Sequence, residues 1–217
     1  MIARIGGRDC ALLGERDAPT LLLQPVDARE LADIGEEAGL IRCLAEGQPF
    51  LLAAFPVKDW NDDLSPWPAP PVFGDRGFGG GAAQTLRYLK ESLLPALPPA
   101  GLRVLGGYSL AGLFALWAAC GRADFDAVAA ASPSVWYPGW LDYARAHPTG
   151  ARRVYLSLGD RESRARNPVM ARVGDAILEQ RRLLEGAAEC TLEWNPGNHF
   201  RDSALRTAKA FAWAMRA

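Results

Sequence analysis

Short, continuously apolar runs alternate with segments of helical periodicity along most of this 217-residue chain. The apolar runs predict strands, and the periodic segments between them predict helices. Strands are expected at residues 20–26, 49–57, 102–105, 125–131, 153–158 and 190–194, and helices at 28–38, 82–94, 113–120, 168–184 and 202–215. Apolar strands that alternate with helices are typical of a parallel sheet covered on both faces. The pattern therefore predicts an α/β fold with a mostly parallel central sheet.

Local signals agree with these boundaries. Asp27 can cap the helix at 28–38, and Pro168 suits the first turn of the helix at 168–184. No internal repeat or linker-like composition divides the chain, so we expect a single domain over residues 1–217. The segment at 58–81 is rich in Pro, Gly, Asp and Trp and is predicted to be a long loop. Loops of this length often line a functional site.

The segment Gly106-Gly107-Tyr108-Ser109-Leu110-Ala111-Gly112 joins the predicted strand at 102–105 to the predicted helix at 113–120. A serine on a sharp turn from strand to helix, between small residues, is typical of a nucleophile elbow. Ala111 stands where the pattern Gly-x-Ser-x-Gly has its second glycine, and alanine is the smallest replacement. Ser109 is therefore the candidate nucleophile.

A serine nucleophile needs a base, and the chain has two histidines. His147 lies at the end of a predicted helix and is expected to be an ordinary surface residue. His199 follows the strand at 190–194, where the third member of a catalytic triad belongs, so it is the candidate base.

Two acids, Asp160 and Glu162, follow the strand at 153–158 and lie between the serine and the histidine in sequence. The order Ser, acid, His is that of α/β-hydrolases. The spacing favours Glu162, with Asp160 as the alternative acid or as a cap of the turn.

A hydrolase of this type also needs two backbone donors for the oxyanion. One is the N–H of Leu110, directly after the nucleophile. The other is expected at Val57 or Lys58, because Pro56 has no N–H.

Aromatic residues gather in the segments that flank the predicted site. The predicted substrate pocket comprises Trp60, Trp67, Tyr108, Trp136, Tyr137 and Phe200, with Phe73 and Trp140 in the same segments. Such residues form a pocket for an acyl or aryl group, or they anchor long loops to the core. We expect two or three of them to contact substrate.

Composition excludes several other classes of function. A net charge of −1 offers no electrostatic footprint for nucleic acid or an anionic membrane. No run approaches the length of a transmembrane helix, and residues 1–7 contain no secretory signal. Four widely spaced cysteines lack metal-ligand spacing, and those at 120 and 190 are expected to be buried thiols. We therefore predict a cytoplasmic, reduced protein without metal or cofactor, in which Asp59, Asp62 and Asp63 cap turns and do not bind a cation.

Four segments, at 59–67, 107–112, 131–136 and 197–200, carry a resemblance that covers the chain from about residue 49 onward. They resemble the esterase group of the α/β-hydrolase superfamily that includes siderophore (enterobactin-type) esterases and S-formylglutathione hydrolase-like enzymes. Ser-Pro-Ser-x-Trp at 132–136 is fairly specific to this group. The resemblance implies the α/β-hydrolase fold, Ser109 as nucleophile and His199 as base. It leaves the acid open, because some relatives use a serine–histidine pair.

Together these residues predict a serine hydrolase that cleaves a small-molecule carboxylic ester through an acyl-enzyme, with no nucleic-acid or membrane partner. Two alternatives stay open. The acyl group could pass to an alcohol instead of water, or the chain could be a non-catalytic binding protein on a hydrolase fold. The oligomeric state, the physiological substrate and its acyl length are not defined by the sequence.

Overall fold

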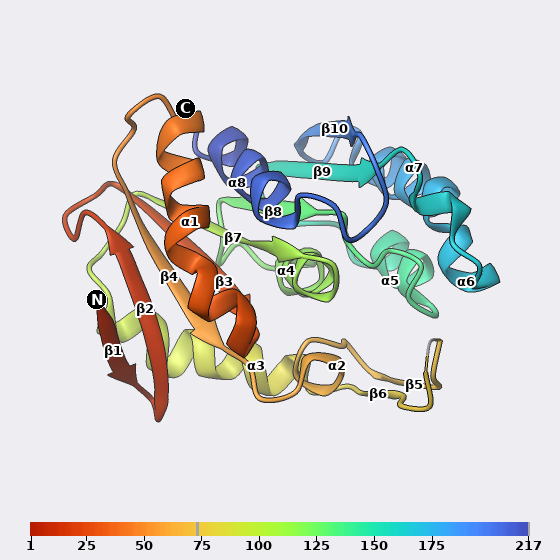
Figure 1. Ribbon diagram of the computed structural model, residues 1–217, viewed down its shortest axis with the longest axis horizontal. Coiled ribbons are helices and arrows are strands. Elements are labelled where there is room, and N and C mark those ends of the chain that lie inside the picture. Colours follow the sequence, from red (N-terminus) through yellow and green to blue (C-terminus); the bar gives the residue numbers. More distant parts are fainter. Residues whose placement is uncertain (73, 217) are drawn as a thin grey trace.

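The computed structural model describes residues 1–72 and 74–216. Within them, eight strands form one sheet in the order β1-β2-β4-β3-β7-β8-β9-β10 (Figure 1). The strands are β1 (Ile2–Ile5), β2 (Arg8–Gly14), β3 (Thr20–Val26), β4 (Phe50–Pro56), β7 (Leu102–Tyr108), β8 (Ala127–Ala131), β9 (Arg153–Gly159) and β10 (Glu189–Asn195). The pairs β1–β2 and β2–β4 are antiparallel, and the other pairs are parallel. The predicted mostly parallel sheet is confirmed.

Helices cover both faces of the sheet (Figure 1). On one face, α1 (Ala28–Leu44) and α8 (Ser203–Ala214) pack against each other and against the sheet. The other face carries α3 (Ala82–Tyr88), α4 (Leu110–Ala119), α5 (Trp140–Ala146) and α7 (Val173–Leu184). Successive strand residues point to opposite faces. Accordingly, Leu22 of β3 packs with the α1 and α8 side, whereas Leu21 and Leu23 pack with the other.

Each of the six predicted strands is present, and the helices differ from expectation mainly at their ends. The Asp27 cap is confirmed: its carboxylate accepts from the Glu30 N–H, and the Glu30 carboxylate accepts from the Asp27 N–H. The helix expected at 168–184 is two helices, α6 (Pro168–Ala171) and α7, that meet at Arg172.

The segment at 58–81 holds more structure than predicted: a short helix, α2 (Trp60–Asp63), and a pair of two-residue strands, β5 (Pro68–Ala69) and β6 (Phe78–Gly79). As predicted, acids cap its turns, since Asp59 accepts from the N–H groups of Asn61 and Asp62.

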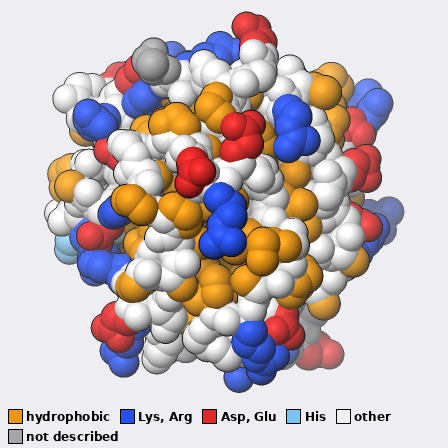
Figure 2. Space-filling model, turned by 90° about the vertical axis from the view of Figure 1, so that its left-hand side faces the viewer, with side chains coloured by type: hydrophobic (Ala, Val, Ile, Leu, Met, Phe, Trp, Pro, Cys, Tyr) orange, Lys and Arg blue, Asp and Glu red, His pale blue; other side chains and the backbone are white. Residues whose placement is uncertain are grey.

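The N-terminal hairpin of β1 and β2 was not predicted. Its turn is made by Gly6 and Gly7, with φ of 53° and 82°, a conformation that glycine adopts without strain. Hydrophobic side chains lie in patches between charged ones on this side of the molecule (Figure 2). Met1 and Ile2 are among the large hydrophobic residues that are exposed. None of the helices in the described ranges has the length and apolar character needed to span a membrane.

Cys120 is buried as expected, but Cys190 is only partly buried because the side chains of β10, at the edge of the sheet, are incompletely covered. His147 is exposed and stacks on Tyr143, as expected of a surface residue.

Candidate active site

Ser109 occupies the junction between β7 and α4. Its backbone has φ 58° and ψ −119°, which is a strained conformation for a residue with a side chain. A Cβ on Gly107 would lie 2.5 Å from the Cβ of Ala111, and a Cβ on Gly106 would lie 2.7 Å from the Ala129 carbonyl oxygen. Gly107 is therefore required by the close approach of β7 and α4, and Gly106 by the close approach of the neighbouring strand β8.

Ser109, His199 and Glu162 form a continuous chain of hydrogen bonds. Ser109 Oγ lies 3.0 Å from His199 Nε2, and His199 Nδ1 lies 2.8 Å from Glu162 Oε2. The serine follows β7, the glutamate follows β9 and the histidine follows β10. Because the carboxyl ends of parallel strands share one edge of the sheet, three residues distant in sequence meet there.

The second oxygen of Glu162 is held by three donors. Oε1 accepts from the Gly159 N–H at 2.7 Å, the Ser132 hydroxyl at 2.9 Å and Arg206 Nη1 at 3.1 Å. The glutamate is 6% exposed, and Arg206 is 1% exposed. A buried carboxylate is tolerated only when it is paired and hydrogen-bonded, and this one is. Its remaining oxygen is thereby aimed at the imidazole.

Asp160, the alternative acid, has a different role. Its Oδ1 accepts from the Gly197 N–H at 2.7 Å, and its own N–H donates to the Asn195 carbonyl. These bonds tie the histidine loop to the end of β9. The structure therefore brings Glu162 to the imidazole and gives Asp160 the turn-capping position predicted as its alternative.

Arg206 was not anticipated from the sequence. From α8 it donates to Glu162, to the Tyr108 hydroxyl at 3.0 Å and to the Pro196 carbonyl at 3.0 Å. The Tyr108 hydroxyl in turn donates to the His199 carbonyl at 2.8 Å. Burial raises the pKa of Tyr108, which keeps the phenol protonated and able to donate. In the sequence, Arg206 adjoins the apolar face of the last helix, a position equally typical of a solvent-exposed arginine.

The expected second oxyanion donors are already engaged. The Val57 N–H donates to the Val26 carbonyl at 2.9 Å, and the Lys58 N–H donates to Asp63 Oδ2 at 2.8 Å. The prediction of Val57 or Lys58 is therefore not supported, because β3 occupies the Val57 N–H and the turn at the start of α2 occupies that of Lys58. Among the backbone N–H groups of residues 57–60, all of which the structure describes, that of Trp60 alone has no hydrogen-bond partner. The Leu110 N–H stands at the first position of α4, where a helix leaves donors free.

Four of the six predicted pocket residues border the site. A cavity of about 440 Å³ beside Ser109 and His199 is lined by Trp60, Tyr108 and Phe200. A second cavity, of about 210 Å³, lies beside His199 and Glu162 and is lined by Trp136 and Phe200. His199, the candidate base, lines both cavities.

Trp67 and Tyr137 line neither of these two cavities, which corrects the prediction that they belong to the substrate pocket. The Tyr137 hydroxyl donates to the Trp67 carbonyl at 2.6 Å, and Trp67 Nε1 donates to the Pro138 carbonyl at 3.0 Å. They anchor segment 58–81 to the loop after β8, which was the alternative role for these aromatics. Trp140 is buried against Gln180, and Phe73 lies outside the described residues.

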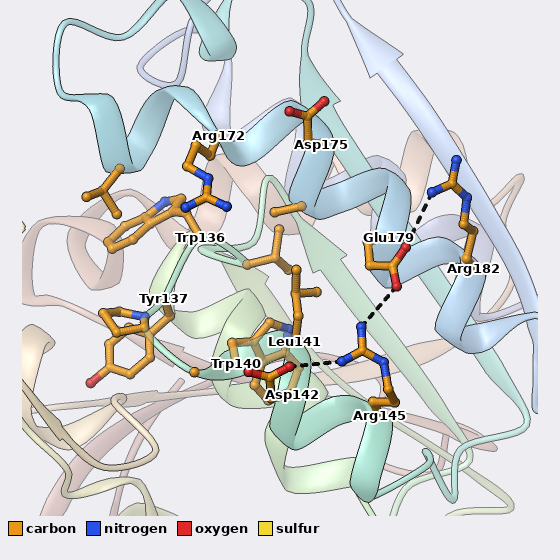
Figure 3. A pocket seen from close by; sticks show the side chains of 15 residues that line it. Trp136, Tyr137, Trp140, Leu141, Asp142, Arg145, Arg172, Asp175, Glu179 and Arg182 are labelled. Carbon is orange, nitrogen blue, oxygen red and sulfur yellow. Dashed lines mark hydrogen bonds and ion pairs between the residues drawn. The ribbon is translucent and has the colours of Figure 1, made fainter.

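A third cavity, of about 720 Å³, lies between α5 and α7 and is bordered by Trp136 (Figure 3). Its charges are largely paired with each other: Arg145 contacts Asp142 and Glu179, and Glu179 contacts Arg182. In the residues that the structure covers, no cluster of three or more His, Cys, Asp or Glu side chains is placed to hold a metal ion.

Solved structures of other proteins share this architecture. An IroE-like serine hydrolase from Shewanella oneidensis superposes with a TM-score of 0.73 at 16% identity, over 95% of this chain and 73% of the other. The chain has the α/β-hydrolase fold. The siderophore hydrolase EstA from Aspergillus nidulans gives a TM-score of 0.64 at 21% identity, over 94% of this chain and 87% of that one.

Enterochelin esterase from Shigella flexneri gives a TM-score of 0.70 at 19% identity, over 95% of this chain and 54% of the other. No protein-family model and no curated protein matches the sequence. The likeness therefore shows the fold alone.

Proposed function

We propose that this chain is a serine hydrolase that cleaves carboxylic esters through an acyl-enzyme intermediate. The observation that carries the proposal is the unbroken hydrogen-bond chain from Ser109 Oγ through His199 to Glu162, with contacts of 3.0 and 2.8 Å. Nucleophile, base and orienting acid in this order are the arrangement that activates a serine hydroxyl. The structural neighbours that are described as serine hydrolases and esterases support the same reading.

Each step follows from the position of these groups. His199 Nε2 takes the proton of Ser109 as the hydroxyl attacks the ester carbonyl, and Glu162 stabilises the imidazolium that forms. The oxyanion is held by the N–H groups of Leu110 and Trp60, each of which contributes about 2.7–4 kcal/mol to lowering the barrier. His199 then protonates the leaving alcohol and activates a water molecule that releases the acid.

The openness of the site favours hydrolysis over transfer to an alcohol. The His199 side chain is 21% exposed, and the neighbouring Phe200 is 87% exposed. Water therefore has direct access to the base that would activate it. The intact triad also favours catalysis over the non-catalytic alternative.

Active-site labelling tests the proposal. A fluorophosphonate probe should modify wild-type protein at Ser109 and should leave Ser109→Ala unlabelled. Ser134→Ala is the matched control, because the Ser134 hydroxyl lies 3.2 Å from that of Ser109 but takes no part in the triad. It should retain the label. A folded wild type that resists the probe would exclude an activated serine. Product analysis with and without an alcohol acceptor then separates hydrolysis from acyl transfer.

A further inference from the structure

The cavity beside Ser109 extends as a groove whose wall on α1 is acidic. Its charged side chains from this helix and its cap are Asp27, Arg29, Glu30, Asp33, Glu36 and Glu37. The facing wall comes from the start of α8 and offers the uncharged Ser203 and Thr207. The groove therefore carries five carboxyl groups and one guanidinium, whereas the charges of the cavity between α5 and α7 largely compensate one another (Figure 3).

Glu37 sets this groove apart from an ordinary acidic surface. It is 7% exposed, and its Oε1 is buried without a hydrogen-bond partner among the described residues. The side chain is hydrogen-bonded to the uncharged amide of Gln24 from β3, so it is Oε1 alone that lacks a donor. No Lys, Arg or His in the described part of the chain makes an ion pair with it. A buried acceptor without a donor is costly, and a ligand that brings a donor removes that cost.

The surroundings raise the pKa of two of these carboxyl groups. Burial raises the pKa of Glu37 to about 8 and that of Glu30 to about 7. Glu30 also raises the pKa of Glu37 by repulsion, and no charged group of α8 lines the groove to oppose it. The remaining ionisable groups there are those of the α1 wall already named, together with Tyr108 and His199 beside Ser109. A cation bound in the groove would favour the ionised carboxylates and would release protons.

We propose that this groove binds the ammonium group of a positively charged ester, with Glu37 as its buried acceptor. The inference rests on the proposed function, since Ser109 at the mouth of the groove would attack the ester. From Asp27 to Glu37 the helix rises about 15 Å, at 1.5 Å per residue. A wall of this length accommodates an ester with several methylene groups between its ammonium group and its carbonyl, and the chain length that is hydrolysed best reports the separation of Glu37 from Ser109.

A matched ester series tests this. Butyrate esters of ω-amino alcohols with three to eight carbons are compared with esters of the n-alkanols that carry CH₃ in place of NH₃⁺. At the best chain length we expect kcat/KM of the amino ester to exceed that of its alkyl match by about tenfold or more. Glu37→Gln should reduce this ratio about tenfold. Glu185→Gln, which removes an exposed acid at the end of α7, should leave the ratio unchanged.

Proton release gives a second readout on wild-type protein. KM of the amino ester should fall as the pH rises from 6.5 to 8.5, relative to the KM of the alkyl ester. Hydrolysis of both esters at equal rates at every chain length and pH would overturn the groove proposal while leaving the hydrolase proposal intact.

If neither ester is hydrolysed, binding of the free amino alcohols to Ser109→Ala is measured by calorimetry. Binding that Glu37→Gln abolishes would support the groove without the hydrolase, and the absence of binding would refute the groove as well.

Discussion

Replacement of Glu162 by glutamine should inactivate the protein without unfolding it. The oxygen Oε1 faces three donors, from Gly159, Ser132 and Arg206, at 2.7–3.1 Å. A glutamine side chain will therefore place its amide oxygen toward them and its NH₂ toward His199. The imidazole Nδ1, 2.8 Å away, must then accept a hydrogen bond, which moves the ring proton to Nε2. In that tautomer the imidazole cannot take the proton of Ser109.

The loss of the correct tautomer should reduce kcat by about 10⁴-fold. This corresponds to about 5 kcal/mol of transition-state stabilisation, at about 1.4 kcal/mol for each factor of ten. The assay is the hydrolysis of p-nitrophenyl butyrate, with thermal unfolding measured in parallel to show that the fold is retained.

Asp160→Asn is the matched control, because Asp160 caps the Gly197 N–H and does not contact the imidazole. An asparagine oxygen can still accept that bond, so kcat should change by less than about tenfold. The reasoning is refuted if Glu162→Gln keeps more than a tenth of the activity, or if both variants lose activity equally.

Three further predictions concern stability. Between pH 4.5 and about 8, the folded protein holds a proton on Glu37 that the unfolded chain has released, so the free energy of unfolding falls as the pH rises. From pH 6 to 8.5 this loss is about 2–3 kcal/mol, and urea unfolding of Glu37→Gln should show a loss smaller by that amount; equal losses would contradict the burial argument. Arg206→Met removes the cation from buried Glu162 and should lower the free energy of unfolding by about 3–5 kcal/mol, with Arg206→Lys intermediate in the same urea titration. Tyr137→Phe leaves the Trp67 carbonyl without its donor and should lower the free energy of unfolding by about 1–3 kcal/mol, measured by thermal unfolding. A raised KM with no loss of stability would instead return Tyr137 to the substrate pocket.

The parts of the fold and site that could be predicted are those encoded by short segments. A continuous apolar run identifies a buried strand, and the turn around Ser109 is specified by its small neighbours, so both were accessible from sequence. The positions of His199 and Glu162 followed from the rule that functional residues gather at the carboxyl ends of parallel strands. The structure brings these three residues together by that route.

The parts that could not be predicted depend on contacts between distant segments. Arg206 has its role because α8 packs across the ends of β7 and β9, which no local pattern records. The donors at Val57 and Lys58 were wrong candidates because partners in β3 and α2 occupy them. The N-terminal hairpin was not predicted because its strands are partly exposed and mix charged with apolar residues.

The dependence of Glu162 on a side chain from α8 sets the order in which the site can mature. During synthesis, residues 109, 162 and 199 all leave the ribosome before the helix that completes their network. Until α8 docks, the carboxylate lacks its buried cation and Tyr108 lacks the guanidinium that holds it beneath the histidine loop. The hydrogen-bond network around the serine is therefore complete only once α8 has docked against the sheet.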